Sequence, residues 1–317
     1  MARMPEKPAV NLHHDDIVAF WRDGVICVRQ LYSADWRDRL ADALGDAASG
    51  KGPGLGRMNM GSDYSEAYAW LWNDTIRDFV LDGPTAWIAR DLFGSKEVNF
   101  YYDQIFMKSR QSANATPWHH DFTFWPLEGD QILSSWTSLD PVDAESSALE
   151  FIAGSHRWPQ RFRAIGADGT DLSTDKGLSH VPDIEKDRDQ YRVLSWSLEP
   201  GDALIFHALT LHGASGNASA SRSRRAITTR WCGDDVTYRP RGVPFPYPHG
   251  LTAGDRLGGP FFPRVCPEID EAAIDLRMQG PVLPDPSLFE EEVRKFAQAN
   301  QEARNSSEPV VLALEYP

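Results

Sequence analysis

Cysteine is scarce in this chain, and its pattern excludes two common uses. The 317 residues contain only Cys27, Cys232 and Cys266, which are far apart and form no CxxC pair. A scattered, odd-numbered set favours neither a disulfide framework nor a thiolate zinc site. The start of the chain also lacks the apolar segment of a signal peptide, and no hydrophobic run approaches transmembrane length. We therefore expect a reducing, cytoplasmic location.

Positive charge is also in short supply. Lysine and arginine total 32 against 46 aspartate and glutamate residues, which gives a net charge of -14. A general nucleic-acid binder needs cations to neutralise phosphates, so this class is disfavoured. Because 41% of the residues are hydrophobic, a sizeable core is available. We expect a small-molecule substrate and neither nucleic acid nor membrane as partner; the sequence leaves the oligomeric state open.

Short strand-like segments recur through the middle of the chain and predict a mainly β (α+β) fold. We expect one domain over 1–317, with a helical N-terminal part at 1–96, a β core at about 97–236, and a proline-rich wrapping tail with a C-terminal helix at 237–317. Residues 64–92 are expected to form two helices. The polar excursion at 159–192 separates two predicted strands, and we expect it to act as a lid or a substrate-selecting loop.

The stretch Pro117-Trp118-His119-His120-Asp121 is the first sign of chemistry. If it is a strand, His119 and Asp121 project to one face and His120 to the other. One imidazole and one carboxylate make two thirds of the metal face that non-haem Fe(II) enzymes use. A third ligand must come from elsewhere, and the later stretch with His207 and His212 offers two candidates.

Several motifs together resemble the phytanoyl-CoA dioxygenase family of Fe(II)/2-oxoglutarate-dependent oxygenases. They lie between about residues 101 and 235, in the family's order: Trp118-His119-His120-Asp121, the segments 135–141 and 149–158, His212-Gly213, and Arg224-Arg225-Ala226-Ile227. The resemblance implies a double-stranded β-helix, the cupin-like jelly roll, with N-terminal helices packed outside. It also implies Fe(II), 2-oxoglutarate and O2 as cofactor and co-substrates.

The resemblance also assigns residues. It implies His212 rather than His207 as the third metal ligand, and Arg224 as the cation for the far carboxylate of 2-oxoglutarate, with Arg225 facing outward. It implies that Trp136 flanks the co-substrate. Members of the family often carry a small hydroxyl residue two positions after the distal histidine. This chain has Ala214 there and Ser215 next, so Ser215 is the candidate for that contact.

Other polar and aromatic residues are candidates for the pocket. Gln104 and Lys108 share one face of a predicted strand, where they could contact co-substrate or substrate. Alternatively, Lys108 extends to solvent at the strand end and Gln104 bonds to backbone. The aromatic candidates for the substrate pocket favour a substrate with an apolar or cationic part: Trp118, Phe122, Trp125 and Trp231.

The expected reaction is the hydroxylation of a small-molecule C–H bond with release of succinate and CO2. Desaturation or ring formation would need only a different placement of the substrate. Halogenation is disfavoured because Asp121 is present, whereas related halogenases have Gly or Ala there. A mononuclear zinc hydrolase remains an alternative because zinc also takes three N/O ligands and leaves one position open. A non-catalytic jelly-roll binding protein is the second alternative.

Overall fold

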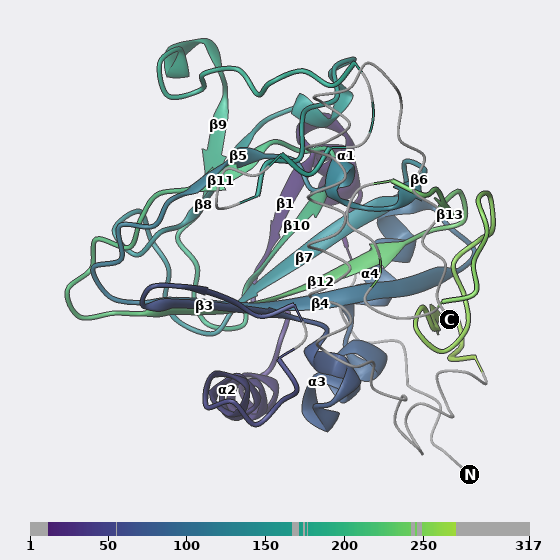
Figure 1. The fold of residues 1–317 in the computed structure, drawn as a ribbon, viewed down its shortest axis with the longest axis horizontal. Helices are drawn as coiled ribbons and strands as arrows, with labels where there is room; N and C mark the ends of the chain where they lie inside the picture. The colour runs from purple at the N-terminus through teal and green to yellow at the C-terminus, as the bar shows by residue number, and fades with distance from the viewer. Residues whose placement is uncertain are drawn as a thin grey trace.

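Two antiparallel β-sheets face each other and enclose the interior of the molecule (Figure 1). The computed structural model describes residues 12–54, 56–166, 171–173, 175, 177–241, 245 and 249–270. The eight-stranded sheet has the order β1-β10-β7-β12-β4-β3-β2, with β14 also paired to β4. Its strands are β1 (Val25–Val28), β2 (Met58–Met60), β3 (Asp63–Ala67), β4 (Val98–Lys108), β7 (Ile132–Ser138), β10 (Ala203–His207), β12 (Arg224–Cys232) and β14 (Arg264–Cys266).

The smaller sheet has four strands in the order β5-β11-β8-β9. They are β5 (Thr116–His119), β8 (Leu149–Ile152), β9 (Val193–Ser195) and β11 (His212–Ala214). A separate two-stranded ribbon pairs β6 (Leu127–Glu128) with β13 (Thr237–Tyr238). Two antiparallel sheets packed face to face, with consecutive strands crossing between them, form the jelly roll that the resemblance implies.

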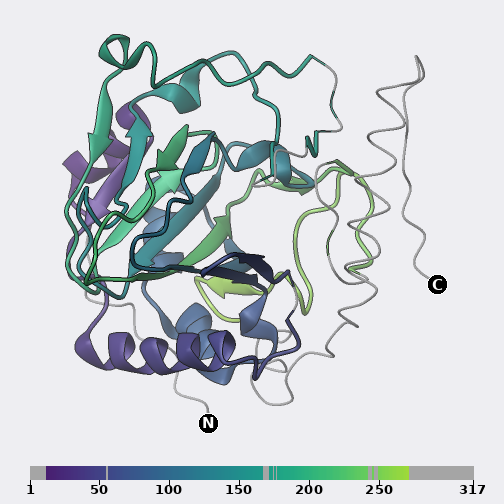
Figure 2. The same cartoon turned by 60° about the vertical axis from the view of Figure 1, so that its left-hand side comes forward.

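Helices lie outside the sheets. They are α1 (His14–Asp23), α2 (Ala34–Ala48), α3 (Asp74–Asp82) and α4 (Thr85–Phe93), with 3-10 turns η1 (Ala69–Leu71), η2 (Phe122–Phe124), η3 (Ser155–Arg157) and η4 (Arg188–Gln190). Ser33 caps α2 by accepting from the Trp36 amide, as a serine at that position favours. Gly24 ends α1 at φ 86°, a left-handed conformation that glycine adopts readily. In both views α2 runs beneath the large sheet, away from the small one (Figures 1 and 2).

The hydrophobic core follows this layering. One cluster fills the space between the two sheets and joins Phe151 of β8 to Phe206 of β10 and Ala226 of β12. A larger cluster packs the outer face of the large sheet against the helices, with Trp70 and Phe100 completely buried. Successive side chains of a strand point alternately to the two faces of the sheet. The position of a residue along its strand therefore decides which of the two clusters its side chain joins.

The predicted organisation needs one correction at its N-terminal end. Residues 64–67, predicted as helix, belong to β3, which pairs with β4 from Gln104 to Met107. Together with β1 and β2, this strand makes the N-terminal part a contributor to the large sheet and not only a helical layer. Helix-like apolar spacing in a short segment was overridden by the free edge of β4, which offers hydrogen-bond partners.

Other predictions remain as they were. The C-terminal helix at 286–304 lies outside the described residues, and the role of 159–192 as a lid stays a prediction. Ile184 and Phe162 of that excursion pack against Ile152 and Leu211 on the small sheet. Within the described ranges, no helix is long and apolar enough to cross a membrane. The cytoplasmic location stays a prediction.

Candidate active site

Three potential metal ligands converge where β5 and β11 pair. His119 is the last residue of β5, His212 is the first residue of β11, and the two are direct partners in the ladder. Asp121 follows at the start of η2. Its Oδ1 lies 3.6 Å from His119 Nε2 and 3.8 Å from His212 Nε2. One ligand atom from each residue lies within 4.8 Å of the others, close enough for one ion to bind all three.

The backbone conformation that brings Asp121 beside His119 differs from the predicted strand. The strand ends at His119, and Asp121 has φ -69° and ψ -32°, so it belongs to a turn and not to a strand. The carboxylate therefore meets His119 because the chain turns after β5. The predicted opposite direction of His120 is confirmed. Its Nε2 accepts a hydrogen bond from the Phe162 amide at 3.0 Å, away from the three ligands.

Backbone carbonyls fix the orientation of both ligand imidazoles. His119 Nδ1 lies 2.8 Å from the Pro117 carbonyl, and His212 Nδ1 lies 3.0 Å from the Thr210 carbonyl. A carbonyl only accepts, so each Nδ1 carries the proton and each Nε2 has a free lone pair. Both free lone pairs are on the atoms nearest Asp121. Such outer hydrogen bonds are the usual means of orienting metal-binding histidines.

The protonation states also suit a divalent cation. Burial, helped by the nearby His119, lowers the pKa of His212 to about 4, which leaves its imidazole neutral at pH 7. Burial opposes ionisation of Asp121, but the neighbouring His119 and His212 outweigh it and bring the carboxyl pKa well below its usual range. The Ser134 hydroxyl donates to Asp121 Oδ2 at 2.9 Å. Metal binding requires a neutral imidazole and an ionised carboxylate, and both are present.

His207, the other candidate for the third ligand, is engaged elsewhere. Its Nε2 lies 2.7 Å from the Asp130 carbonyl, and its Nδ1 accepts from the Leu209 amide at 3.1 Å. Both ring nitrogens are therefore occupied. The structure groups His212, and not His207, with His119 and Asp121.

A pair of buried cations lies farther along the same interior. Arg224 of β12 stands directly opposite Lys108 of β4. Arg224 Nη1 donates to the Ser147 carbonyl at 2.6 Å, and Lys108 Nζ donates to the Ser147 hydroxyl at 3.1 Å and to the Ser215 carbonyl at 3.0 Å. Among the described residues, neither cation forms an ion pair with a carboxylate. Like charges directly opposite each other destabilise a sheet, so this pair calls for an anion.

The surroundings of the cation pair strengthen this interpretation. Burial first and the charge of Arg224 second lower the pKa of Lys108 to about 8, and burial lowers the pKa of Arg224 to about 10. The Arg224 guanidinium carbon lies 5.4 Å from the centre of the Trp136 ring. Ser147, which joins the two cations, has φ 72°, a conformation that a serine adopts only when its surroundings impose it.

Three predicted residues lie at the cation pair, and a fourth lies elsewhere on the inner face of the large sheet. Lys108, Trp136 and Arg224 lie together at the cation pair, and Gln104 lies on the inner face of β4, where Arg230 Nη2 donates to its Oε1 at 2.9 Å. A fifth predicted residue, Trp125, lies near Gln104 and Arg230. Its Nε1 donates a hydrogen bond to the Tyr102 hydroxyl at 3.0 Å.

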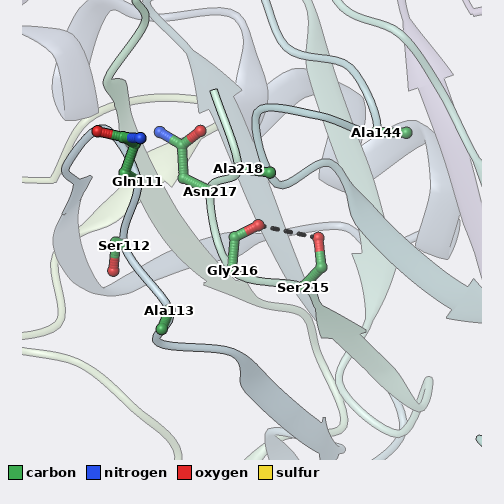
Figure 3. Close-up of a pocket in the computed structure, with 8 residues that line it drawn as sticks. All are labelled: Gln111, Ser112, Ala113, Ala144, Ser215, Gly216, Asn217 and Ala218. Atoms are coloured by element: carbon green, nitrogen blue, oxygen red, sulfur yellow. Dashed lines mark hydrogen bonds between the residues drawn. The ribbon is translucent and has the colours of Figure 1, made fainter. Parts of the chain in front are cut away.

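Three other predictions are corrected, those for Trp118, Trp231 and Ser215. Trp118 alternates with His119, so it faces outward and donates to Glu185 at 2.7 Å. Trp231 follows Arg230 onto the outer face and packs against Phe100, with ring centres 5.3 Å apart. The Arg241 guanidinium carbon lies 4.3 Å from the centre of the Phe122 ring, and the place of Phe122 in the substrate pocket stays a prediction. The Ser215 side chain is exposed and donates to the Gly216 carbonyl (Figure 3). Only the backbone carbonyl of Ser215 therefore reaches Lys108.

Two surface cavities are lined by residues other than the three ligands. The one in Figure 3, of about 490 Å3, is lined by uncharged residues of the loops after β4, β7 and β11: Gln111, Ser112, Ala113, Ala144, Ser215, Gly216, Asn217 and Ala218. It has no titratable or metal-binding side chain. The other, of about 520 Å3, is bordered by Phe122, Arg161 and Arg241. Here Arg241 is paired with Asp175 at 3.2 Å. Neither cavity offers the chemistry of the three ligands.

Sequence reasoning missed four polar residues that the structure brings to the interior. Ser134 binds Asp121, Ser147 joins the two cations, and Thr228 and Arg230 lie on the inner face of β12. Thr228 and Arg230 could have been found from Arg224, because residues 224, 228 and 230 are an even number of positions apart and share one face of the strand. Ser134 and Ser147 had no such signal, since their roles depend on strand register and on a left-handed backbone conformation.

This chain combines a jelly-roll fold with a cluster of two histidines and one carboxylate and with a buried cation pair. That combination of fold and site defines the non-haem iron, 2-oxoglutarate-dependent oxygenases. The chain belongs to the phytanoyl-CoA dioxygenase (PhyH) family, whose family model matches residues 20–226. Among curated proteins, it is 22% identical over 158 residues to a probable phytanoyl-CoA dioxygenase of Caenorhabditis elegans, with 47% of this chain and 48% of that protein covered. It is 24% identical over 131 residues to the peroxisomal phytanoyl-CoA dioxygenase of Rattus norvegicus, with 41% and 37% covered. The chain thus spans less than half the length of these relatives.

Solved structures show the same fold. The non-haem alpha-ketoglutarate-dependent carbocyclase SnoK from nogalamycin biosynthesis superposes with a TM-score of 0.67 at 24% identity, covering 80% of this chain and 97% of that one. The epimerase SnoN, solved with Fe3+, alpha-ketoglutarate and nogalamycin RO, gives 0.64 at 23% identity, covering 79% and 97%. EctD from S. alaskensis, solved with 2-oxoglutarate and 5-hydroxyectoine, gives 0.57 at 22% identity, covering 70% and 76%.

Proposed function

We propose that this chain is an Fe(II)- and 2-oxoglutarate-dependent dioxygenase that oxidises a C–H bond of a small molecule. The observation that carries the proposal is the presence, in one interior, of a three-ligand metal cluster and of two neighbouring buried cations, Lys108 and Arg224, that form no ion pair within the described part of the chain. A zinc hydrolase would need the first feature but has no use for the second. A vestigial binding protein would not need three converging metal ligands.

The residues fit both groups. His119, Asp121 and His212 would hold Fe(II), whose preference for imidazole and carboxylate ligands matches the cluster. Arg224 and Lys108 would bind the far carboxylate of 2-oxoglutarate, since a buried anion needs charged donors. Lys108 bonds to the carbonyl of Ser215, three residues after His212, which corresponds to roughly 10 Å of extended chain. The two centres are therefore close enough for one small dicarboxylate to lie between them.

When bound, Fe(II) and 2-oxoglutarate supply the oxidising chemistry, in which O2 and the 2-oxo acid are consumed as succinate and CO2 are released. The protein's part is to bind and orient. The Pro117 and Thr210 carbonyls hold each ligand imidazole with Nε2 toward the metal position, and Ser134 holds the carboxylate. The apolar cluster around Phe151 and Phe206 keeps water away from the reacting groups. Hydroxylation is the simplest outcome.

The test is succinate formation from 2-oxoglutarate by the purified chain, with Fe(II) or Zn(II) added, in air and under argon. We expect succinate only with Fe(II) and oxygen, because many enzymes of this chemistry consume some co-substrate without their substrate. The Asp121→Ala variant should form none. If the parent binds neither Fe(II) nor 2-oxoglutarate, the dioxygenase proposal is wrong, and hydrolytic activity with Zn(II) would favour the alternative.

A further inference from the structure

A second buried guanidinium lies at the metal end of the interior. Arg230 is only 4% exposed and stands opposite Ser134, the residue whose hydroxyl binds Asp121. Its charge is among those that lower the pKa of Asp121, whereas Lys108 responds to Arg224. Arg230 and Arg224 share a strand face but are six residues, roughly 20 Å, apart along it. The two arginines therefore serve different ends of the interior.

The guanidinium of Arg230 is fixed by two aromatic rings and one hydrogen bond, but some of its N–H groups have no acceptor among the described residues. It lies 4.2 Å from the centre of the Tyr102 ring and 5.7 Å from that of Trp125, and Nη2 donates to Gln104 Oε1 at 2.9 Å. Its Nε and Nη1 are buried and have no hydrogen-bond partner among the described residues. In the same part of the chain, no carboxylate comes within ion-pair distance of it. Three N–H groups thus lack an acceptor.

The nearest acids are committed to other partners. Asp103 lies on the opposite face of β4 and accepts from the amides of Ala69 and Trp70. Asp121 accepts from Ser134 and faces the two ligand histidines. A guanidinium has only N–H donors and no acceptor atom of its own, so its buried N–H groups need acceptors from elsewhere. Leaving buried donors without acceptors is unfavourable, and a ligand that supplies the acceptors would remove that cost.

We propose that Arg230 binds a carboxylate on the substrate and thereby places the substrate beside the metal. This inference rests on the proposed function, and it names the substrate class: a molecule with a carboxylate and an apolar body. Gln104 fixes the guanidinium through its Oε1, while its Nε2 donates to the Ser65 hydroxyl at 3.0 Å. The Thr228 hydroxyl lies on the same face of β12, is buried, and has no hydrogen-bond partner among the described residues. A carboxylate can accept from two N–H groups of one guanidinium at once.

A buried arginine beside the aromatic rings changes the expected charge of the substrate. Aromatic rings near the pocket suggested a substrate with an apolar or cationic part. The structure shows that the rings of Tyr102 and Trp125 already contact a cation, the guanidinium of Arg230. A second cation beside it would be repelled. The charge at this end of the interior therefore selects an anionic group.

The experiment compares carboxylates with their neutral amides. Hippurate, 3-phenylpropionate and octanoate, each paired with its primary amide, are titrated into the anaerobic Fe(II)·2-oxoglutarate complex of parent, Arg230→Met and Arg225→Met. Arg225 is the matched control because it lies on the same strand, faces outward and pairs with Asp140 at 2.7 Å. Binding is followed by the change in the visible charge-transfer band. We expect carboxylates to bind the parent and the Arg225 variant at least tenfold more tightly than amides, and Arg230→Met to lose that preference.

Melting of the metal-free proteins gives a second, independent result. If Arg230 is unpaired without substrate, Arg230→Met should melt at or above the parent temperature, and carboxylates should raise the melting temperature of the parent and of Arg225→Met but not that of Arg230→Met. A parent with no preference for any carboxylate in either assay would overturn the proposal. So would an Arg230→Met variant that melts lower and keeps the preference. A parent that forms no charge-transfer band but shows Arg230-dependent stabilisation by carboxylates would refute the proposed function and leave the anion site standing.

Discussion

Lys108 and Arg224 stand directly opposite each other on neighbouring strands, and both donate to Ser147. Two cations held this close inside a protein repel each other unless an anion joins them. This relationship makes the co-substrate site recognisable without any ligand, and it leads to the first two predictions.

Replacing Arg224 with Met should weaken 2-oxoglutarate binding by ~100-fold, because a buried charged hydrogen-bonding partner contributes about 3 kcal/mol. The affinity can be measured from the charge-transfer band under argon. Arg225→Met is the matched control, since its pair with Asp140 is partly exposed and should matter little. Equal losses in the two variants would show that the strand, and not the buried guanidinium, determines affinity.

Lys108 should make co-substrate binding depend on pH. Its pKa is lowered to about 8 by burial and by Arg224, and a bound dianion should raise it again. Affinity for 2-oxoglutarate should therefore be greatest below pH 8 and fall as the pH rises above it, because the free lysine must then take up a proton to pair with the anion. In Lys108→Met the affinity should be lower and flat between pH 7 and pH 9. A parent profile that stays flat over this range would contradict the assignment.

Ser134 should support the metal through Asp121. Ser134→Ala removes the hydroxyl that donates to Asp121 Oδ2, and loss of such an outer hydrogen bond weakens metal binding about tenfold or more. The matched control is the adjacent Ser135→Ala. Ser135 is equally buried, but its hydroxyl has no partner among the described residues. Competition with a metal indicator gives both Fe(II) affinities; a larger loss in the Ser135 variant would contradict the proposed role.

Thr228→Val should leave the protein as stable as the parent or stabilise it by about 1 kcal/mol. The change removes a buried hydroxyl that has no partner among the residues the structure describes, and it keeps the side-chain volume. Urea unfolding of the metal-free chain measures the difference. A destabilisation above about 2 kcal/mol would mean that the hydroxyl has a partner inside the folded chain.

The metal cluster and Arg224 could be predicted from sequence because short motifs carry them. His119 and Asp121 are two residues apart, and His212 is followed by Gly213, so local spacing was informative even though the turn at Asp121 was not foreseen. The aromatic candidates were harder. Trp118 and Trp231 are the right residue types, but each faces outward because its neighbour, His119 or Arg230, faces inward.

The remaining site residues depend on contacts between distant segments. Ser147 reaches the cations only because its backbone adopts φ 72°, and Ser134 reaches Asp121 only through the pairing of β7 with its neighbours. Similarly, β3 forms because the edge of β4 is available to it. Residue type and periodicity do not show which distant segments pair. In contrast, the alternation of side chains along β12, counted from Arg224, would have been enough to find Arg230.

The central claim is that His119, Asp121 and His212 bind Fe(II) beside a 2-oxoglutarate held by Arg224 and Lys108. The most direct measurement is an anaerobic titration of the metal-free protein with Fe(II) and then 2-oxoglutarate, in parent, His212→Ala and His207→Gln. A visible charge-transfer band in the parent and in the His207 variant, but not in the His212 variant, is the predicted result. No band in folded parent protein, or a band that survives in the His212 variant and disappears in the His207 variant, would contradict the account.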